Sequence, residues 1–127
     1  YDFSFSGLKT QVLNYINSER QAEREINIPD LAASFQESIM EVIADKAISA
    51  ATSYGNNKIV VAGGVAANSR LRELLESKGE AAGIEILKPA QILCTDNGAM
   101  IACSAYYQMK KGEFADMSLD ACPGLEF

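Results

Sequence analysis

Two short stretches of this sequence contain residue types and spacings that suit ligand binding. In the first, the apolar run KIVVA (58–62) leads into Gly63 and Gly64, and Asn68 follows shortly after them. Adjacent glycines after a buried strand allow backbone conformations that other residues avoid, and they leave room for a flat ligand beside the main chain. The Asn68 amide offers a donor and an acceptor, which suits a ribose hydroxyl or a purine edge. Gly63, Gly64 and Asn68 are therefore candidate nucleotide-binding residues.

The same stretch also has a purely structural interpretation. Two glycines can form a tight strand-to-helix turn without any ligand, and asparagine often caps a helix by bonding to nearby backbone N–H groups. A glycine pair is moreover a short and weak motif. From these residues alone, the structural interpretation is favoured.

The second stretch, ILCTDNGAMIA (92–102), places Asp96 at the turn into a predicted helix. A carboxylate held rigidly at a helix start suits a hard or borderline metal ion. Aspartate is also a favoured helix N-cap, and spacing alone favours that capping role for Asp96. Cys94 is a weaker candidate, because a lone cysteine beside a strand is commonly a small buried residue.

Composition limits the class of protein to which the chain can belong. Its 127 residues are 48% hydrophobic and 22% charged, which predicts a single globular domain over residues 1–127. The formal net charge of −6 disfavours sequence-independent binding of nucleic acid, which needs clustered Lys and Arg. Arg70 and Arg72, like Lys110 and Lys111, have acidic neighbours and are expected on a solvated surface. No apolar run approaches the roughly 18 residues of a membrane helix.

The cysteine and histidine content indicates the compartment and limits the metal chemistry. The three cysteines, Cys94, Cys103 and Cys122, form no CxxC pair, and histidine is absent. This pattern disfavours a disulfide scaffold and indicates a reducing cytoplasm. A metal site within this chain would depend on carboxylates and lone thiolates, which excludes zinc-finger and HExxH arrangements. The start, YDFSFSG, has no signal-peptide pattern and lacks methionine, so we expect a piece of a longer protein.

Hydrophobic spacing predicts the elements that position these residues. Strands are expected at 1–6, 58–62 and 83–88, and helices at 8–18, 31–54, 67–78 and 98–111. Asp30 is expected to cap the long helix, and Gly55 and Gly79 to end the helices before them. This order predicts an α/β fold with some parallel strand pairing.

Three motifs together resemble one known family. FSFSGLKT (3–10), VAGGVAANSRLR (61–72) and CTDNGAMIA (94–102) have the order and spacing found in the carboxy-terminal half of the TsaD family. These proteins are tRNA threonylcarbamoyladenosine synthases, also called O-sialoglycoprotein endopeptidases or glycoproteases. The resemblance implies a ribonuclease-H-like second lobe, truncated here, of the ASKHA fold shared by actin, heat-shock ATPase chaperones and sugar kinases.

The resemblance also implies an activity for the full-length protein. The family transfers a threonylcarbamoyl group from threonylcarbamoyl-AMP to an adenosine beside the tRNA anticodon. Gly63, Gly64 and Asn68 match the adenosine motif, and Asp96 matches a ligand of one divalent metal ion, iron or zinc. The family's other metal ligands, two histidines of an HxxxH motif, and its phosphate-binding glycine loop belong to the first lobe. This chain contains neither, so the fragment alone is expected to be inactive.

The expected partners are threonylcarbamoyl-AMP or an adenine nucleotide, tRNA, a paralogous subunit and a small ATPase, with no membrane. The acidic balance requires that the tRNA-binding surface lie in the missing half or on a partner protein. Three alternatives stay open: a metallopeptidase, a non-catalytic paralogous subunit, and a nucleotide-hydrolysing sugar kinase or chaperone. The presence of both Asn68 and Asp96 disfavours the paralogous subunit. The peptidase lacks an obvious general base beside Asp96, and the combination of the adenosine motif with CTDNGAMIA (94–102) argues against the kinase or chaperone.

Overall fold

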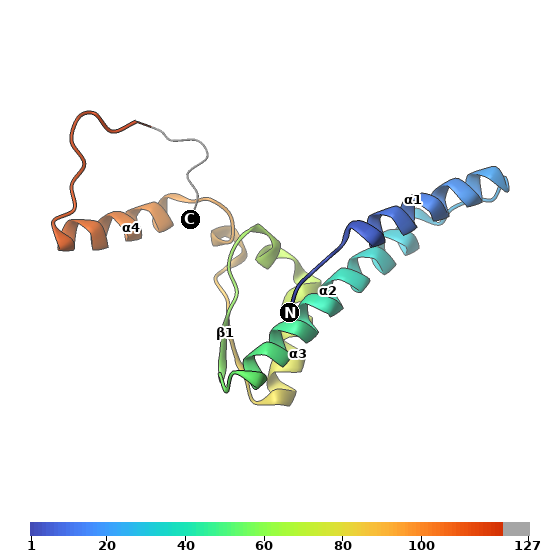
Figure 1. Ribbon diagram of the computed structural model, residues 1–127, viewed down its shortest axis with the longest axis horizontal. Helices are drawn as coiled ribbons and strands as arrows, with labels where there is room; N and C mark the ends of the chain where they lie inside the picture. Colours follow the sequence, from blue (N-terminus) through green and yellow to red (C-terminus); the bar gives the residue numbers. More distant parts are fainter. Residues whose placement is uncertain (121–127) are drawn as a thin grey trace. The chain divides into compact units, whose positions relative to one another are not determined.

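A computed structural model describes residues 1–120 of the chain (Figure 1). By their internal contacts the residues form two compact units, Tyr1–Cys94 and Thr95–Phe127. Helices and a short parallel sheet occur together in the first unit, which confirms the α/β class. The single domain over residues 1–127 stays a prediction.

The first unit contains three α-helices, two strands and two short 3₁₀ turns. In chain order these are α1 (Ser6–Gln21), α2 (Ile28–Ser53), β1 (Lys58–Val60), η1 (Gly64–Ala67), α3 (Ser69–Ala82), β2 (Glu85–Leu87) and η2 (Gln91–Leu93). In Figure 1, α1 lies beside the first half of α2, and side chains from both helices line a shallow groove between them.

The core lies where α2 and α3 pack on each other and on the sheet. Strands β1 and β2 are parallel, with Ile59 opposite Ile86. The most buried cluster joins α2 to α3; it consists of Met40, Ala44, Leu71, Leu74 and Leu75. Strand β1 is less completely covered. Val60 is 74% exposed, and an open apolar hollow of about 460 Å³ lies along β1.

Ion pairs join α2 to α3 at the edge of this core. The Arg70 guanidinium donates to both carboxylate oxygens of Glu37, at 2.7 and 2.6 Å, and to Glu73 at 3.2 Å. The hydrogen bonds from Arg70 hold the pKa of Glu37 below its usual range. Arg70 thus lies at the surface beside acidic residues, as predicted, with 38% of its side chain exposed, and it is bound between two helices.

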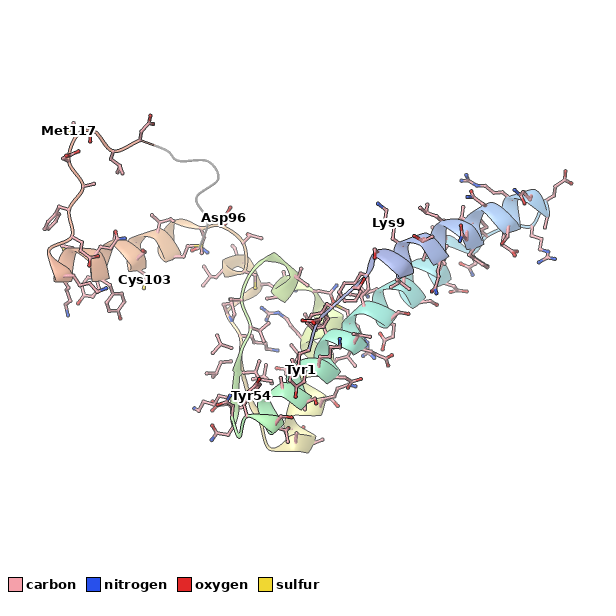
Figure 2. The ribbon with its side chains drawn as sticks, in the orientation of Figure 1. Tyr1, Lys9, Tyr54, Asp96, Cys103 and Met117 are labelled. Carbon is pink, nitrogen blue, oxygen red and sulfur yellow. The ribbon has the colours of Figure 1, made fainter. Side chains whose placement is uncertain are left out.

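The strand predicted at residues 1–6 is wrong. Residues 1–5 belong to no strand, and α1 begins at Ser6. Tyr1 instead lies against the end of α2: its hydroxyl donates to Ser53 Oγ at 2.8 Å, and its ring lies 6.4 Å from that of Tyr54 (Figure 2). Alternating aromatic residues become a strand only when another strand supplies hydrogen bonds. In the described part of the chain, β1 and β2 pair only with each other.

The predicted C-terminal end of helix α2 is confirmed, whereas the predicted N-cap is wrong. Its N-cap is Asn27 and not Asp30, because the Asp30 backbone N–H donates to Asn27 Oδ1 at 3.2 Å. Pro29 lies in the first turn, where its missing N–H costs nothing. Gly55 follows the helix end as predicted.

Helix α3 runs past its predicted end. Gly79 lies inside the helix, and the helix ends at Gly83, whose φ of +67° is the left-handed conformation that glycine adopts without strain. Gly79 serves close packing instead: a Cβ there would lie 2.8 Å from the Ile84 carbonyl oxygen and 2.9 Å from the Ile86 side chain. The prediction that Gly79 ends this helix is therefore wrong, and the structural role of Gly79 is to allow close packing.

The second unit contains α4 (Gly98–Lys111), as predicted. Lys110 and Lys111 are exposed, as expected. Cys94, in the first unit, and Cys103, in α4, are free thiols, whereas Cys122 lies outside the described residues. No helix within residues 1–120 is long and apolar enough to span a membrane.

Candidate functional site

The candidate nucleotide-binding residues lie at one edge of the sheet. Because β1 and β2 are parallel, their carboxyl ends share that edge. The β1 exit turn (residues 63–68) and the β2 exit loop (residues 88–94) therefore begin side by side, and Gln91 Nε2 joins them by donating to the Ala67 carbonyl oxygen at 2.7 Å. In α/β sheets this is the edge at which ligands bind.

The two glycines of the β1 exit turn have different structural requirements. Gly63 has a φ of +87°, a conformation that L side chains rarely adopt, so the backbone itself requires glycine there. Gly64 has no positive φ, and a Cβ at this position would meet no atom within 4 Å. Both residues are exposed. Nothing in residues 1–120 therefore requires glycine at position 64, and the main chain beside it is open.

Asn68 caps helix α3. Its Oδ1 accepts a hydrogen bond from the Leu71 N–H at 3.0 Å, and its Nδ2 donates to Gln36 Oε1 on α2 at 3.0 Å. The geometry thus includes the local backbone bond of the structural interpretation. An amide has two N–H donors and two acceptor lone pairs, so Asn68 keeps capacity for a further partner. Its contact with a nucleoside stays a prediction.

Arg72 also lies at this edge, although its acidic neighbours in the sequence predict a solvated surface. That expectation is wrong, because the side chain is half-buried and its guanidinium donates to Ala66 O at 2.5 Å and Pro89 O at 2.6 Å. A spacing signal was present: Asn68 and Arg72 are four residues apart at the start of a helix, so both lie on one face. Charge alone had suggested exposure.

Cys94 ends the β2 exit loop and is buried, as predicted. Only 5% of it is exposed, and its Sγ lies 3.1 Å from Arg72 Nη2. The thiol therefore packs inside the first unit as a small side chain.

Asp96 belongs to the second unit and lies directly before α4 (Figure 2). The capping role that spacing favoured for Asp96 is wrong. Asn97 caps α4, because its Oδ1 accepts from the Met100 N–H at 3.0 Å. Asp96 is exposed, and its carboxylate accepts no hydrogen bond from another described residue. It is therefore free to bind an external ligand.

Among the described residues, Asp96 could supply one ligand to a metal ion, but it does not lie in a complete metal site. Within residues 1–120 there is no group of three or more His, Cys, Asp or Glu side chains that could hold a metal ion. A carboxylate beside a capped helix start suits a divalent cation, but the remaining ligands would have to come from outside residues 1–120. The metal role of Asp96 stays a prediction.

Comparison with known proteins identifies close relatives. The family described as TsaD, tRNA N6-adenosine threonylcarbamoyltransferase, matches residues 1–103. A protein of that name from Moorella thermoacetica is 54% identical over 124 residues, which cover 98% of this chain and 36% of the relative. The relative of the same name from Clostridioides difficile is 50% identical over 126 residues, covering 99% and 37%. One from Clostridium perfringens is 51% identical over 124 residues, covering 98% and 37%. The chain thus spans little more than a third of the length of these relatives.

Proposed function

This chain belongs to the TsaD family of tRNA N6-adenosine threonylcarbamoyltransferases, and on that premise we propose that it is part of an enzyme that modifies tRNA. The full-length protein would transfer a threonylcarbamoyl group from threonylcarbamoyl-AMP to the exocyclic amine of an adenosine beside the anticodon. The amine nitrogen attacks the carbamoyl carbon, the bond from that carbon to the phosphate oxygen breaks, and AMP leaves as the amine loses a proton.

A mixed anhydride such as this donor already contains a good leaving group. The main task of the enzyme is then to hold two large substrates in reacting positions. In this proposal the β1 exit turn binds the nucleoside end of the donor, and Asp96 contributes to the metal site. These residues span little more than a third of the length of the relatives, and by themselves they would be inactive in this proposal.

The observation that carries the nucleotide proposal is the glycine at position 64. The backbone conformation explains Gly63, but neither φ nor packing explains Gly64 in the described residues. A ligand lying against the exposed main chain would explain it, because any side chain would then occupy ligand space. Asn68 is close by in sequence, and its second amide N–H can donate to the nucleoside while Oδ1 caps α3.

Asp96 has the corresponding role at the metal site. Its exposed carboxylate supplies one oxygen ligand, and the HxxxH histidines of the first lobe would supply nitrogen ligands. A bound divalent ion, iron or zinc, would orient the donor and polarise its carbonyl as a Lewis acid. The contribution of this chain is to hold the carboxylate next to a helix that Asn97 caps independently.

The incompletely covered sheet supports the assignment to a ribonuclease-H-like lobe of the ASKHA fold. Parallel sheets are normally buried on both faces, yet β1 leaves Val60 74% exposed beside an open apolar hollow. Further strands and the first lobe of the full-length protein would cover these surfaces. With a net charge of −6, the chain leaves most tRNA contacts to the first lobe, the paralogous subunit or the small ATPase. The free thiols Cys94 and Cys103 suit a cytoplasmic protein.

Substitutions in the full-length protein test the nucleotide site. We expect Gly64→Ala to leave the thermal midpoint near that of the wild type and to weaken AMP binding by about tenfold or more, as one lost contact would. Asn68→Ser keeps a capping hydroxyl but loses the amide donor, so it should weaken AMP binding while α3 stays capped. Gly7→Ala is a matched control, because a Cβ at Gly7 also meets no atom within 4 Å. Wild-type AMP affinity in both Gly64→Ala and Asn68→Ser would refute this site.

A second experiment tests the reaction and the metal ligand together. Threonylcarbamoyl transfer to tRNA is assayed with the full-length protein and its partners, with bound metal measured in parallel. Asp96→Asn should lose metal and turnover together, whereas Asp116→Asn, which removes another exposed carboxylate of the second unit, should lose neither. An active wild type with an unaffected Asp96→Asn variant would keep the transferase but remove Asp96 from its metal site.

A further inference from the structure

The guanidinium of Arg72 bridges the two loops that leave the sheet. From the first turn of α3, its Nε donates to the Ala66 carbonyl oxygen in the β1 exit turn at 2.5 Å. Its Nη2 donates to the Pro89 carbonyl oxygen in the β2 exit loop at 2.6 Å and to Cys94 Sγ at 3.1 Å. One side chain thus contacts both loops at the edge where nucleotide binding is proposed.

The chemistry of arginine explains why this position suits it. A guanidinium presents five N–H donors in a rigid plane, so it can reach acceptors in different directions at the same time. Its partners here are two backbone carbonyl oxygens and the Cys94 sulfur. Hydrogen bonds from a charged donor to such acceptors are stronger than neutral ones, more so when the side chain is half-buried as here. A lysine, with a single nitrogen, cannot span both carbonyls in this way.

The β1 exit turn needs such a restraint. It contains two adjacent glycines, which have the widest choice of backbone conformations, and both are exposed. Arg72 bonds to Ala66 and Gln91 bonds to Ala67, so both side chains hold the carboxyl-terminal part of the turn against the β2 exit loop. Without this restraint, part of the binding free energy of a ligand would be used to order the β1 exit turn, and the ligand would bind more weakly.

We propose that Arg72 is a positioning residue, which holds the β1 exit turn in the conformation that binds the adenosine part of the donor. The nucleotide part of this inference rests on the proposed function above. Arg72 itself acts through the turn and need not touch the ligand.

The test uses the full-length protein with Arg72→Met and Arg72→Lys. Arg70→Met is the matched control, because Arg70 is on the same helix and makes as many side-chain hydrogen bonds, but to carboxylates on α2 and α3. Three quantities are measured: amide exchange of residues 63–68, the dissociation constant for AMP by calorimetry, and KM and kcat for threonylcarbamoyl transfer.

We expect both Arg72 variants to speed amide exchange in residues 63–68 by about tenfold, the scale of one lost hydrogen bond. The AMP dissociation constant and the KM for the donor should rise by a similar factor, with kcat within twofold. Arg70→Met should lower the thermal midpoint but leave AMP affinity within twofold. A general loss of packing would instead lower AMP affinity in Arg70→Met as well.

Three results would overturn the proposal. Amide exchange in residues 63–68 of Arg72→Met at the wild-type rate would show that Arg72 does not restrain the β1 exit turn. Normal AMP affinity in both Arg72 variants, with a wild type that binds AMP, would refute the role in binding while leaving the proposed function intact. Full rescue of affinity by Arg72→Lys would show that only the positive charge matters. If the wild type binds no AMP, the proposed function fails. The amide-exchange rates alone then decide whether Arg72 holds the β1 exit turn against the β2 exit loop.

Discussion

Replacing Gly79 by alanine sets two physical effects against each other. Gly79 lies inside α3, where alanine is the better helix former. On helix propensity alone, Gly79→Ala should stabilise the protein by about 1 kcal/mol. The packing against β2 predicts the opposite, and the structure allows the two effects to be compared.

The packing effect should dominate. The new Cβ would lie 2.8 Å from the Ile84 carbonyl oxygen, 2.9 Å from Ile86 Cγ1 and 3.0 Å from Ile86 Cδ1. The Ile86 side chain can rotate, but Ile84 is held in place because its N–H donates to the Gly79 carbonyl oxygen at 2.8 Å. Overpacking of this kind typically costs 1–3 kcal/mol, and the upper part of that range, about 2–3 kcal/mol, applies here because the nearest atom is a backbone oxygen. After the propensity gain of about 1 kcal/mol, we expect a net destabilisation of about 1–2 kcal/mol.

Denaturant unfolding of the purified protein that contains this chain would measure the effect. The midpoint should fall at an unchanged m-value, since the surface exposed on unfolding is the same. Gly7→Ala in α1 is the control, because nothing lies within 4 Å of its Cβ, and it should cause no loss of stability. A Gly79→Ala protein as stable as the wild type would show that α3 and β2 separate easily, and would refute the packing argument.

Three further predictions concern helix ends and an ion pair. Glu23 follows α1 with a φ of 54°, so Glu23→Gly should stabilise the protein by about 1 kcal/mol in the same assay, and a loss would contradict the strain. Asn68→Ala should cost about 1 kcal/mol through the lost cap of α3, whereas Asn68→Ser should cost less; equal losses would argue against the cap. The pKa of Glu37 is lowered in the folded protein by the hydrogen bonds from Arg70, so its contribution to stability is present above the unfolded pKa and is lost as the pH falls through the folded pKa. Stability measured from pH 7 downward should therefore fall more steeply in the wild type than in Glu37→Gln, and identical acid profiles would show that the pair contributes nothing.

Local patterns predicted the elements well where the interactions are themselves local. The helical conformation of α2 and α3 and the extent of α4 depend on side chains three and four residues apart, which sequence spacing displays directly. Helix ends were less predictable, because neighbouring residues compete for the same cap. Asn27 takes the place expected for Asp30, and Asn97 the place expected for Asp96.

The sequence by itself determined the family, the α/β class and the glycine turn at the end of β1, because motif residues and their spacing are properties of the chain. Tertiary structure decided what spacing cannot express. Residues 1–5 have the alternation of a strand but lack a strand to pair with. Gly79 does not end a helix. Glycine is needed at this position because α3 packs too closely on Ile84 and Ile86 to leave room for a Cβ. The sequence predicts Arg72 as a surface charge, whereas in the folded chain its guanidinium donates to the carbonyl oxygens of Ala66 and Pro89. In each case the deciding contact lies outside the helix or strand that contains the residue, and only the fold brings such contacts together.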